Sequence, residues 1–233
     1  MDLTTTLAAG IISSLLAVAL IEGYGFLRRR LAQRPLRQLL GSPRRVGIAV
    51  PDFPIRVSDR TGSLMALHDS LALAHVLEVC SRINAATVIA STSNRPNDLP
   101  REIIAIGGPV SNMTTKLHLS RYCPGFSAIE VDNYDPGFSA SDQRFEESDD
   151  TTWGFIVRLG PEVTGRDGDV LLLWGATALA TVAAAFYFAT KPQDLTNIGT
   201  ASIFVALNVS RHLGYRALPA QIVDVTARAF RRD

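Results

Sequence analysis

Two glycine-containing segments hold residue types with which proteins bind small anions or sugars. The first, residues 106–115, reads IGGPVSNMTT and contributes five candidate ligand-binding residues: Gly107, Gly108, Ser111, Asn112 and Thr114. Glycine lets a ligand approach the backbone closely, and the exposed N–H groups at a helix start attract anions. The hydroxyl and amide side chains add neutral hydrogen-bonding groups. The segment is therefore a candidate ligand-binding loop.

The second segment, residues 174–177, reads WGAT and contributes Gly175 and Thr177. It again places a glycine at the end of an apolar run, before a hydroxyl residue that opens a helix. If both runs are strands of one parallel sheet, their carboxyl ends meet at the edge where ligands of such sheets bind. Two such loops could cradle a phosphate or a sugar. Glycines and Ser, Thr or Asn caps are also ordinary features of strand-to-helix turns.

Two carboxylates stand where they could assist these loops. Asp52 directly follows the first predicted strand, and Asp69 lies on the first predicted helix. A carboxylate there can bind a ribose hydroxyl or act as a general base, although an Asp after a strand is also a common turn residue. Asp52 therefore joins the candidate ligand-binding residues. In an enzyme, Asp52 or Asp69 would be the acid/base group.

The diagnostic sequence motifs of several enzyme classes are absent from the sequence. It contains neither G-x-G-x-x-G nor G-x-x-x-x-G-K-[ST], which argues against a dinucleotide oxidoreductase and a P-loop NTPase. G-x-S-x-G is also missing. His68 and His75 would lie about 10 Å apart along one helix, too far to share one metal ion. We therefore predict no metal site, can name no cofactor, and expect Cys80 and Cys123 to be free thiols.

The N-terminus predicts a membrane anchor. Leu7–Leu27 is an apolar run whose only charge is Glu22, and the following stretch Arg28–Arg45 holds seven arginines and no acid. About 20 apolar residues suffice to cross a bilayer, and the positive-inside rule puts Met1 outside and the rest in the cytoplasm. A cleaved signal peptide fits less well, because its basic region should precede the apolar core. Membrane lipid is thus the expected partner of Leu7–Leu27 and Arg28–Arg45.

The sequence divides into a transmembrane anchor (residues 1–28), a basic juxtamembrane stalk (29–44) and one α/β domain (45–233). Beyond residue 45 the chain holds 20 acids and 16 bases, a net charge of −4. An acidic domain argues against nucleic acid as the main partner, since phosphate contacts need clustered Lys and Arg.

Apolar runs and amphipathic segments alternate along this domain. Strands are expected at residues 45–51, 86–92, 102–109, 126–131, 153–160, 169–174 and 201–209. Helices are expected at residues 63–84, 111–122, 175–189 and 221–230, with a turn-rich segment at 52–62 and an exposed loop at 132–152. The alternation predicts an α/β fold in which helices cover both faces of a Rossmann-like, mostly parallel sheet.

The uncharged run Val170–Ala189 could instead be a second membrane span. Its β-like VLLLW, the break at Gly175 and the Ala-rich continuation favour a buried strand followed by a buried helix. A second span would also move five C-terminal arginines outside, against the positive-inside rule. We therefore predict a strand–helix unit.

The pattern of a strand, the pair Gly107-Gly108 and a helix resembles Rossmann-like nucleotide-sensing domains of bacterial signalling and defence systems. Several of those domains are fused to membrane helices. The resemblance covers the two loops and the strand–helix alternation; it implies a fold and transfers no catalytic residue.

These observations predict a single-pass membrane protein with its N-terminus outside. Its cytoplasmic domain would bind or sense a nucleotide-like or other anionic small molecule. Two other classes stay open: a membrane-anchored hydrolase or transferase acting on a nucleotide or glycosyl compound, and a non-enzymatic interaction or scaffold protein. Turnover would identify the enzyme, and a lack of stabilisation by small ligands would indicate the scaffold.

Overall fold

The computed structural model describes residues 30–57, 60–91, 100–130, 136–199 and 201–231. The predicted anchor Leu7–Leu27 lies outside these residues and stays a prediction. None of the described helices is both long and apolar enough to span a membrane. The chain divides into two compact units, Met1–Pro35 and Leu36–Asp233, and the second carries the sheet.

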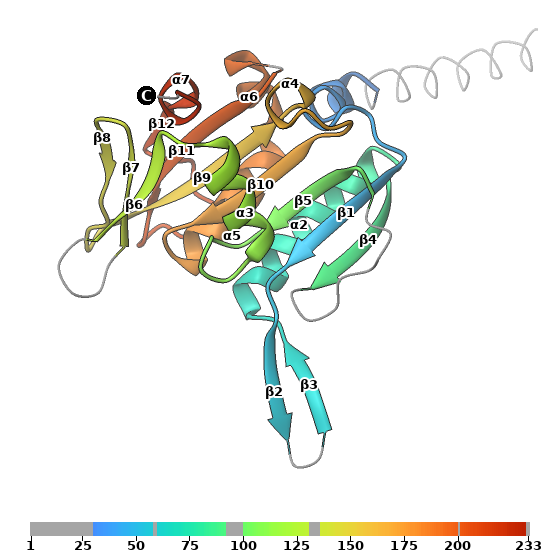
Figure 1. Cartoon of the computed structure of the whole chain (residues 1–233), viewed down its shortest axis with the longest axis horizontal. Helices are drawn as coiled ribbons and strands as arrows, with labels where there is room; N and C mark the ends of the chain where they lie inside the picture. The colour runs from blue at the N-terminus through green and yellow to red at the C-terminus, as the bar shows by residue number, and fades with distance from the viewer. Residues whose placement is uncertain (1–29, 58–59, 92–99, 131–135, 200, 232–233) are drawn as a thin grey trace, which may run out of the picture. The chain divides into compact units, whose positions relative to one another are not determined.

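A seven-stranded sheet forms the centre of the second unit, in the order β12-β11-β9-β10-β5-β1-β4 (Figure 1). Its strands are β1 (Arg45–Val50), β4 (Ala86–Ser91), β5 (Glu102–Ile106), β9 (Thr151–Leu159), β10 (Val170–Gly175), β11 (Ile203–Ser210) and β12 (Gln221–Asp224). The neighbours β4, β1, β5 and β10 are parallel, whereas β9 and β12 run against them. The predicted α/β fold with a large, mainly parallel sheet is confirmed, and it is compatible with a Rossmann-like arrangement.

Both faces of the sheet are covered (Figure 1). One face packs against residues 36–40, α2 (Leu67–Arg82), α5 (Ala178–Thr190) and α6 (Pro192–Ile198). The other packs against α3 (Met113–Tyr122), α4 (Pro161–Thr164), α7 (Thr226–Ala229) and a small sheet of β6 (Phe126–Glu130), β7 (Pro136–Ala140) and β8 (Gln143–Phe145). Along β5, Ile104 and Ile106 face the first core while Ile103 and Ala105 face the second. Since successive strand residues point to opposite faces, a doubly covered strand is apolar throughout.

The uncharged run Val170–Ala189 is a strand followed by a helix, as predicted: β10 leads directly into α5. Helix α5 lies close to the sheet at a glycine pair, Gly154 on β9 and Gly175 on β10, which face each other in the ladder. A Cβ atom on Gly154 would lie 2.8 Å from the carbonyl oxygen of Ala180, and one on Gly175 would lie 2.6 Å from its carbonyl carbon. Glycine at both positions is therefore required for α5 to pack on the sheet.

Three predicted boundaries are wrong. The turn-rich segment 52–62 forms the hairpin of β2 (Phe53–Val57) and β3 (Arg60–Leu64), which extends away from the sheet (Figure 1). The helix expected from residue 63 therefore begins only at Leu67, after the N-cap residue Ala66. The helix expected at 221–230 is instead β12 followed by the short α7, because residues 221–224 pair with β11.

The expected exposed loop 132–152 also contains strands. β7 pairs with β6 on one side and with β8 on the other in the small sheet, so β6 is not a strand of the central sheet. The many acids of this segment predicted that it would be exposed, but two of its aromatic side chains, Phe138 and Phe145, are only 5% and 0% exposed. Burial of these rings against the central sheet stabilises the segment.

The folded unit also begins ahead of the boundary expected at Arg45. Residues 30–40 are helical, and Leu36, Leu39 and Leu40 are at most 2% exposed within the core. Residues 36–44 of the predicted stalk thus belong to the second unit, which carries the sheet.

Candidate ligand-binding site

A pocket of about 260 Å³ lies at the carboxyl ends of β5 and β10. Its walls come from the start of α2 (Ala66 and Asp69), the loop 107–111, Phe138 of β7 and the start of α5 (residues 175–178 and Thr181). Because β5 and β10 are parallel neighbours, the loops that follow them emerge side by side. In open α/β sheets, ligands bind at this kind of crevice beyond the carboxyl strand ends.

Five of the eight predicted ligand-binding residues line this pocket: Gly107, Gly108, Ser111, Gly175 and Thr177. The two glycine loops, far apart in sequence, are thus brought together as expected. The other three, Asn112, Thr114 and Asp52, are not among the lining residues. Asp52 is half-buried just beyond β1.

The two glycines of the first loop have different roles. Gly107 has a φ of +100°, and a Cβ atom there would lie 3.1 Å from both Pro51 Cγ and Ser111 Oγ. Its N–H donates to the carbonyl of Leu173 at 3.0 Å, which fixes the loop to the end of β10. Gly107 is therefore required by the backbone. A Cβ on Gly108 would meet its nearest neighbour, Trp174 Cε3, at 3.7 Å, so this position accepts a methyl group.

Asn112 stabilises the loop from behind the pocket. Its Oδ1 accepts hydrogen bonds from the N–H groups of Thr114 (2.9 Å) and Thr115 (3.4 Å), which makes it the N-cap of α3. Its Nδ2 donates to the carbonyls of Ala49 (3.0 Å) and Ile106 (2.8 Å). With both amide atoms used and only 3% of the residue exposed, Asn112 joins the ends of β1 and β5 to α3. For this residue the capping interpretation holds.

Thr177 opens α5 and is held by a chain of side chains. Its Oγ1 accepts a hydrogen bond from the N–H of Ala180 at 3.3 Å and lies 3.2 Å from Oγ1 of Thr152. Thr152 in turn donates to Glu147 at 2.7 Å. Glu147, with a side chain 5% exposed, pairs with Arg211 at 2.6 Å. The chain of contacts therefore runs from the surface to the pocket wall.

Asp69 is the charged residue of the pocket lining. It is 9% exposed, and among the described residues none donates a hydrogen bond to its carboxylate. Burial raises the pKa of Asp69, and the nearby His68 offsets part of that rise. A buried carboxylate without a partner is costly, which is why such groups are concentrated at functional sites.

Some lining residues were missed from the sequence. Thr181 lies one helical turn after Thr177, and this i, i+4 spacing could have placed both on one face. Phe138 comes from the segment interpreted as a loop; its ring packs against Trp174 with 4.9 Å between ring centroids. Glu147 and Thr152 carry no sequence signal, because only the fold brings them to Thr177.

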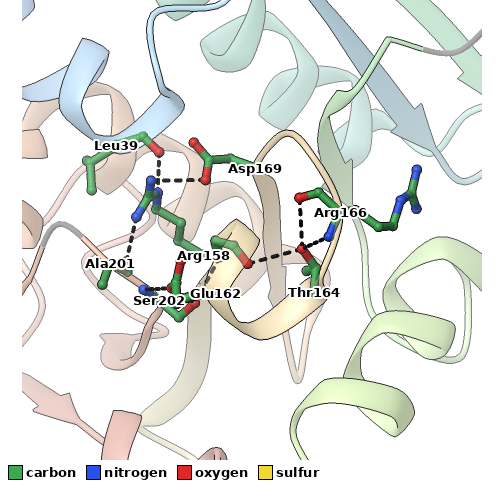
Figure 2. Close-up of polar contacts among 9 residues, drawn as sticks. Leu39, Arg158, Glu162, Thr164, Arg166, Asp169, Ala201 and Ser202 are labelled. Atoms are coloured by element: carbon green, nitrogen blue, oxygen red, sulfur yellow. Dashed lines mark hydrogen bonds and ion pairs between the residues drawn. The ribbon is translucent and has the colours of Figure 1, made fainter.

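A second buried polar cluster lies at the opposite end of β10 (Figure 2). Arg158, 6% exposed, donates to the carbonyls of Leu39 and Ala201, both at 2.6 Å, and pairs with Asp169 at 2.9 Å. Its Nε thus holds residues 36–40 against the sheet, while its other two guanidinium nitrogens bind Ala201 and Asp169. Close by, Glu162 accepts a hydrogen bond from the Ser202 N–H at 2.7 Å. We interpret this cluster as structural, because protein groups already occupy the guanidinium.

Within the described part of the chain, no group of three or more His, Cys, Asp or Glu residues is arranged to hold a metal ion. Comparison of the chain with protein-family models, curated proteins and solved structures finds no match. The pocket itself is therefore the basis for assigning a function to this protein.

Proposed function

We propose that this protein is a membrane-tethered module that binds a nucleotide-like or other anionic small molecule in the pocket at the ends of β5 and β10. The observation that supports the proposal is the convergence of the Gly107-Gly108 and Gly175–Thr177 loops on one pocket. Lys and Arg are absent from its described lining, so backbone N–H groups at the starts of α2 and α5 would hold the anionic group.

The size of the pocket limits what it can enclose. About 260 Å³ is slightly below the range of roughly 300–1,000 Å³ typical of small-molecule sites. It suits a sugar phosphate, or one part of a nucleotide whose remainder extends into solvent.

Melting temperatures of the full-length protein test the proposal. The protein, kept in mild detergent, would be heated with nucleotides, cyclic and linear dinucleotides, and sugar phosphates. A ligand at about 100 times its Kd adds roughly 2.7 kcal/mol to the free energy of unfolding, a shift of several degrees.

Gly108→Ala is the informative variant, because it adds a methyl group to the pocket wall without a backbone clash. We expect it to fold and to lose most of the ligand-induced shift. Ala128→Val adds bulk at an exposed position of β6 and should keep the shift. If no compound stabilises the folded wild-type protein, the proposal fails and a scaffold role is favoured.

The tether is proposed from the sequence alone: Leu7–Leu27 would cross the membrane, Arg28–Arg45 would contact lipid headgroups, and the domain would be cytoplasmic. A reporter fused after Asp233 tests this orientation. We expect a cytoplasmic signal; an external signal would overturn the single-pass topology.

A second function, hydrolysis or group transfer on a nucleotide or glycosyl compound, is favoured by Asp69. Its burial in the pocket and its raised pKa are properties of a general acid or base. An enzyme would convert a bound compound and lose kcat in Asp69→Asn, whereas a binding module would form no product.

A further inference from the structure

We propose that the pocket recognises a pair of vicinal hydroxyl groups, as found on ribose and other sugars, through Asp69, Thr177 and Thr181. The inference rests on the proposed small-molecule function and specifies the part of the ligand that enters between α2 and α5. These two helices pack side by side, and both begin at the pocket.

The hydrogen-bond directions around Thr177 follow from Glu147. The Glu147 carboxylate, paired with Arg211, is an acceptor, so the single hydroxyl proton of Thr152 points toward it. Thr152 can therefore only accept from Thr177, whose own proton is then used. Oγ1 of Thr177 also accepts from the N–H of Ala180, which leaves one lone pair for a ligand.

The other hydroxyl groups of the pocket also use their protons within the protein. The Thr181 hydroxyl donates to the carbonyl of Thr177 at 3.2 Å, and the Ser111 hydroxyl donates to the carbonyl of Gly108 at 3.4 Å. Asp69, a residue only 9% exposed, lines the pocket and adds carboxylate oxygens that lack a protein donor among the described residues. The wall formed by Asp69, Thr177 and Thr181 therefore offers only acceptors, and a ligand must bring the donors.

Hydroxyl groups meet this requirement better than a cation does. The starts of α2 and α5 carry the positive ends of their helix dipoles, which disfavour a positive charge at this place. A hydroxyl group can donate to Asp69 or a threonine and also accept from backbone N–H groups at the helix starts. Two adjacent hydroxyls can donate to the two oxygens of one carboxylate, which suits Asp69.

Matched pairs of sugars test the inference. Binding to the full-length protein would be measured with AMP and 2′-deoxy-AMP, and with ribose 5-phosphate and 2-deoxyribose 5-phosphate. Loss of one hydroxyl should raise Kd by about 10- to 100-fold, because it leaves a buried acceptor without a partner. Asp69→Asn should bring the ratio of the two Kd values, deoxy compound to hydroxyl compound, close to one. Asp149→Asn, at an exposed position, should keep it.

Thr181→Val is a second test of the inference, because it removes an acceptor at nearly constant side-chain volume. We expect a reduced ratio for this variant and an unchanged ratio for Thr181→Ser. Equal affinity for the hydroxyl and deoxy compounds, or a ratio that survives in Asp69→Asn, would overturn the inference. Pyrophosphate has no hydroxyl pair. If it stabilises the wild type but not Gly108→Ala, the proposed binding function stands without the hydroxyl-pair inference. If no compound binds, both proposals fail.

Discussion

The hydroxyl oxygens of Thr152 on β9 and Thr177 at the start of α5 lie 3.2 Å apart. This contact joins a strand of the antiparallel part of the sheet to the helix that forms one wall of the pocket. Through Thr152, the position of Thr177 depends on the Glu147–Arg211 pair nearer the surface. The pocket is thus supported by residues outside the two glycine loops.

Thr152→Val should test this support. The substitution leaves the Thr177 hydroxyl and one Glu147 oxygen without their partner, and a lost buried hydrogen bond typically costs about 1–2 kcal/mol. We expect the free energy of unfolding in urea to fall by about that amount. Thr152→Ser, which retains the hydroxyl, should lie closer to the wild type. Equal losses in the two variants would indicate that the methyl group matters more than the hydroxyl.

Asp69→Asn should change stability in a pH-dependent way. Because the pKa of Asp69 is raised in the folded state, the folded protein holds this proton more tightly than the unfolded chain does. This group's contribution to stability therefore falls as pH rises from the ordinary Asp range near about 4 through the raised pKa.

Asparagine does not titrate, so Asp69→Asn should be stabilised relative to wild type more at pH 7.5 than at pH 4.5. Urea unfolding of both proteins at the two pH values measures the difference. A relative stability that is the same at both values would contradict the raised pKa.

Asn112→Ala should destabilise the protein by about 3 kcal/mol, combining about 1 for the lost cap with about 1 for each lost donor bond. The bonds concerned are those to Thr114, Ala49 and Ile106. Asn112→Asp keeps the cap but turns a buried carboxylate oxygen toward the Ala49 and Ile106 carbonyls, so it should be destabilised at least as much as Asn112→Ala. Denaturant midpoints rank the variants. A ligand-binding role would instead predict a loss of affinity at unchanged stability.

Both cysteines should be unreactive in the native protein. Cys80 and Cys123 are fully buried, and burial raises their pKa values to about 11 and about 12. The thiolate is the reactive form, so iodoacetamide at pH 7.5 should label neither thiol in buffer and both in urea. Mass spectrometry gives the number of adducts. Rapid labelling of the native protein would show that one thiol is accessible.

Arg158→Met should destabilise the protein by about 3–5 kcal/mol, because it leaves the buried Asp169 without its cation and frees the Leu39 and Ala201 carbonyls. The double variant Arg158→Met with Asp169→Leu removes both charges and should recover part of the loss. A double-mutant cycle in urea measures the coupling. Purely additive losses would mean that the ion pair contributes nothing beyond packing.

Sequence reasoning worked where one physical signal dominated. The runs at residues 103–106 and 170–189 are largely apolar because both faces of their elements are buried, and their strand or helix character follows from glycine breaks and length. It failed at residues 132–152, where the acids concealed Phe138 and Phe145. It also failed at 221–224, whose strand state depends on pairing with β11.

The sequence by itself determined the alternating α/β pattern, the two glycine loops and the prediction of an apolar anchor, because these depend on composition and on spacing within short segments. Only the tertiary structure decided that Gly108, Thr177 and Asp69 share a pocket while Asn112 holds the loop from behind. An asparagine after a glycine loop has the same local pattern whether it caps a helix or binds a ligand. Its role is set by hydrogen bonds to carbonyls as distant in sequence as Ala49.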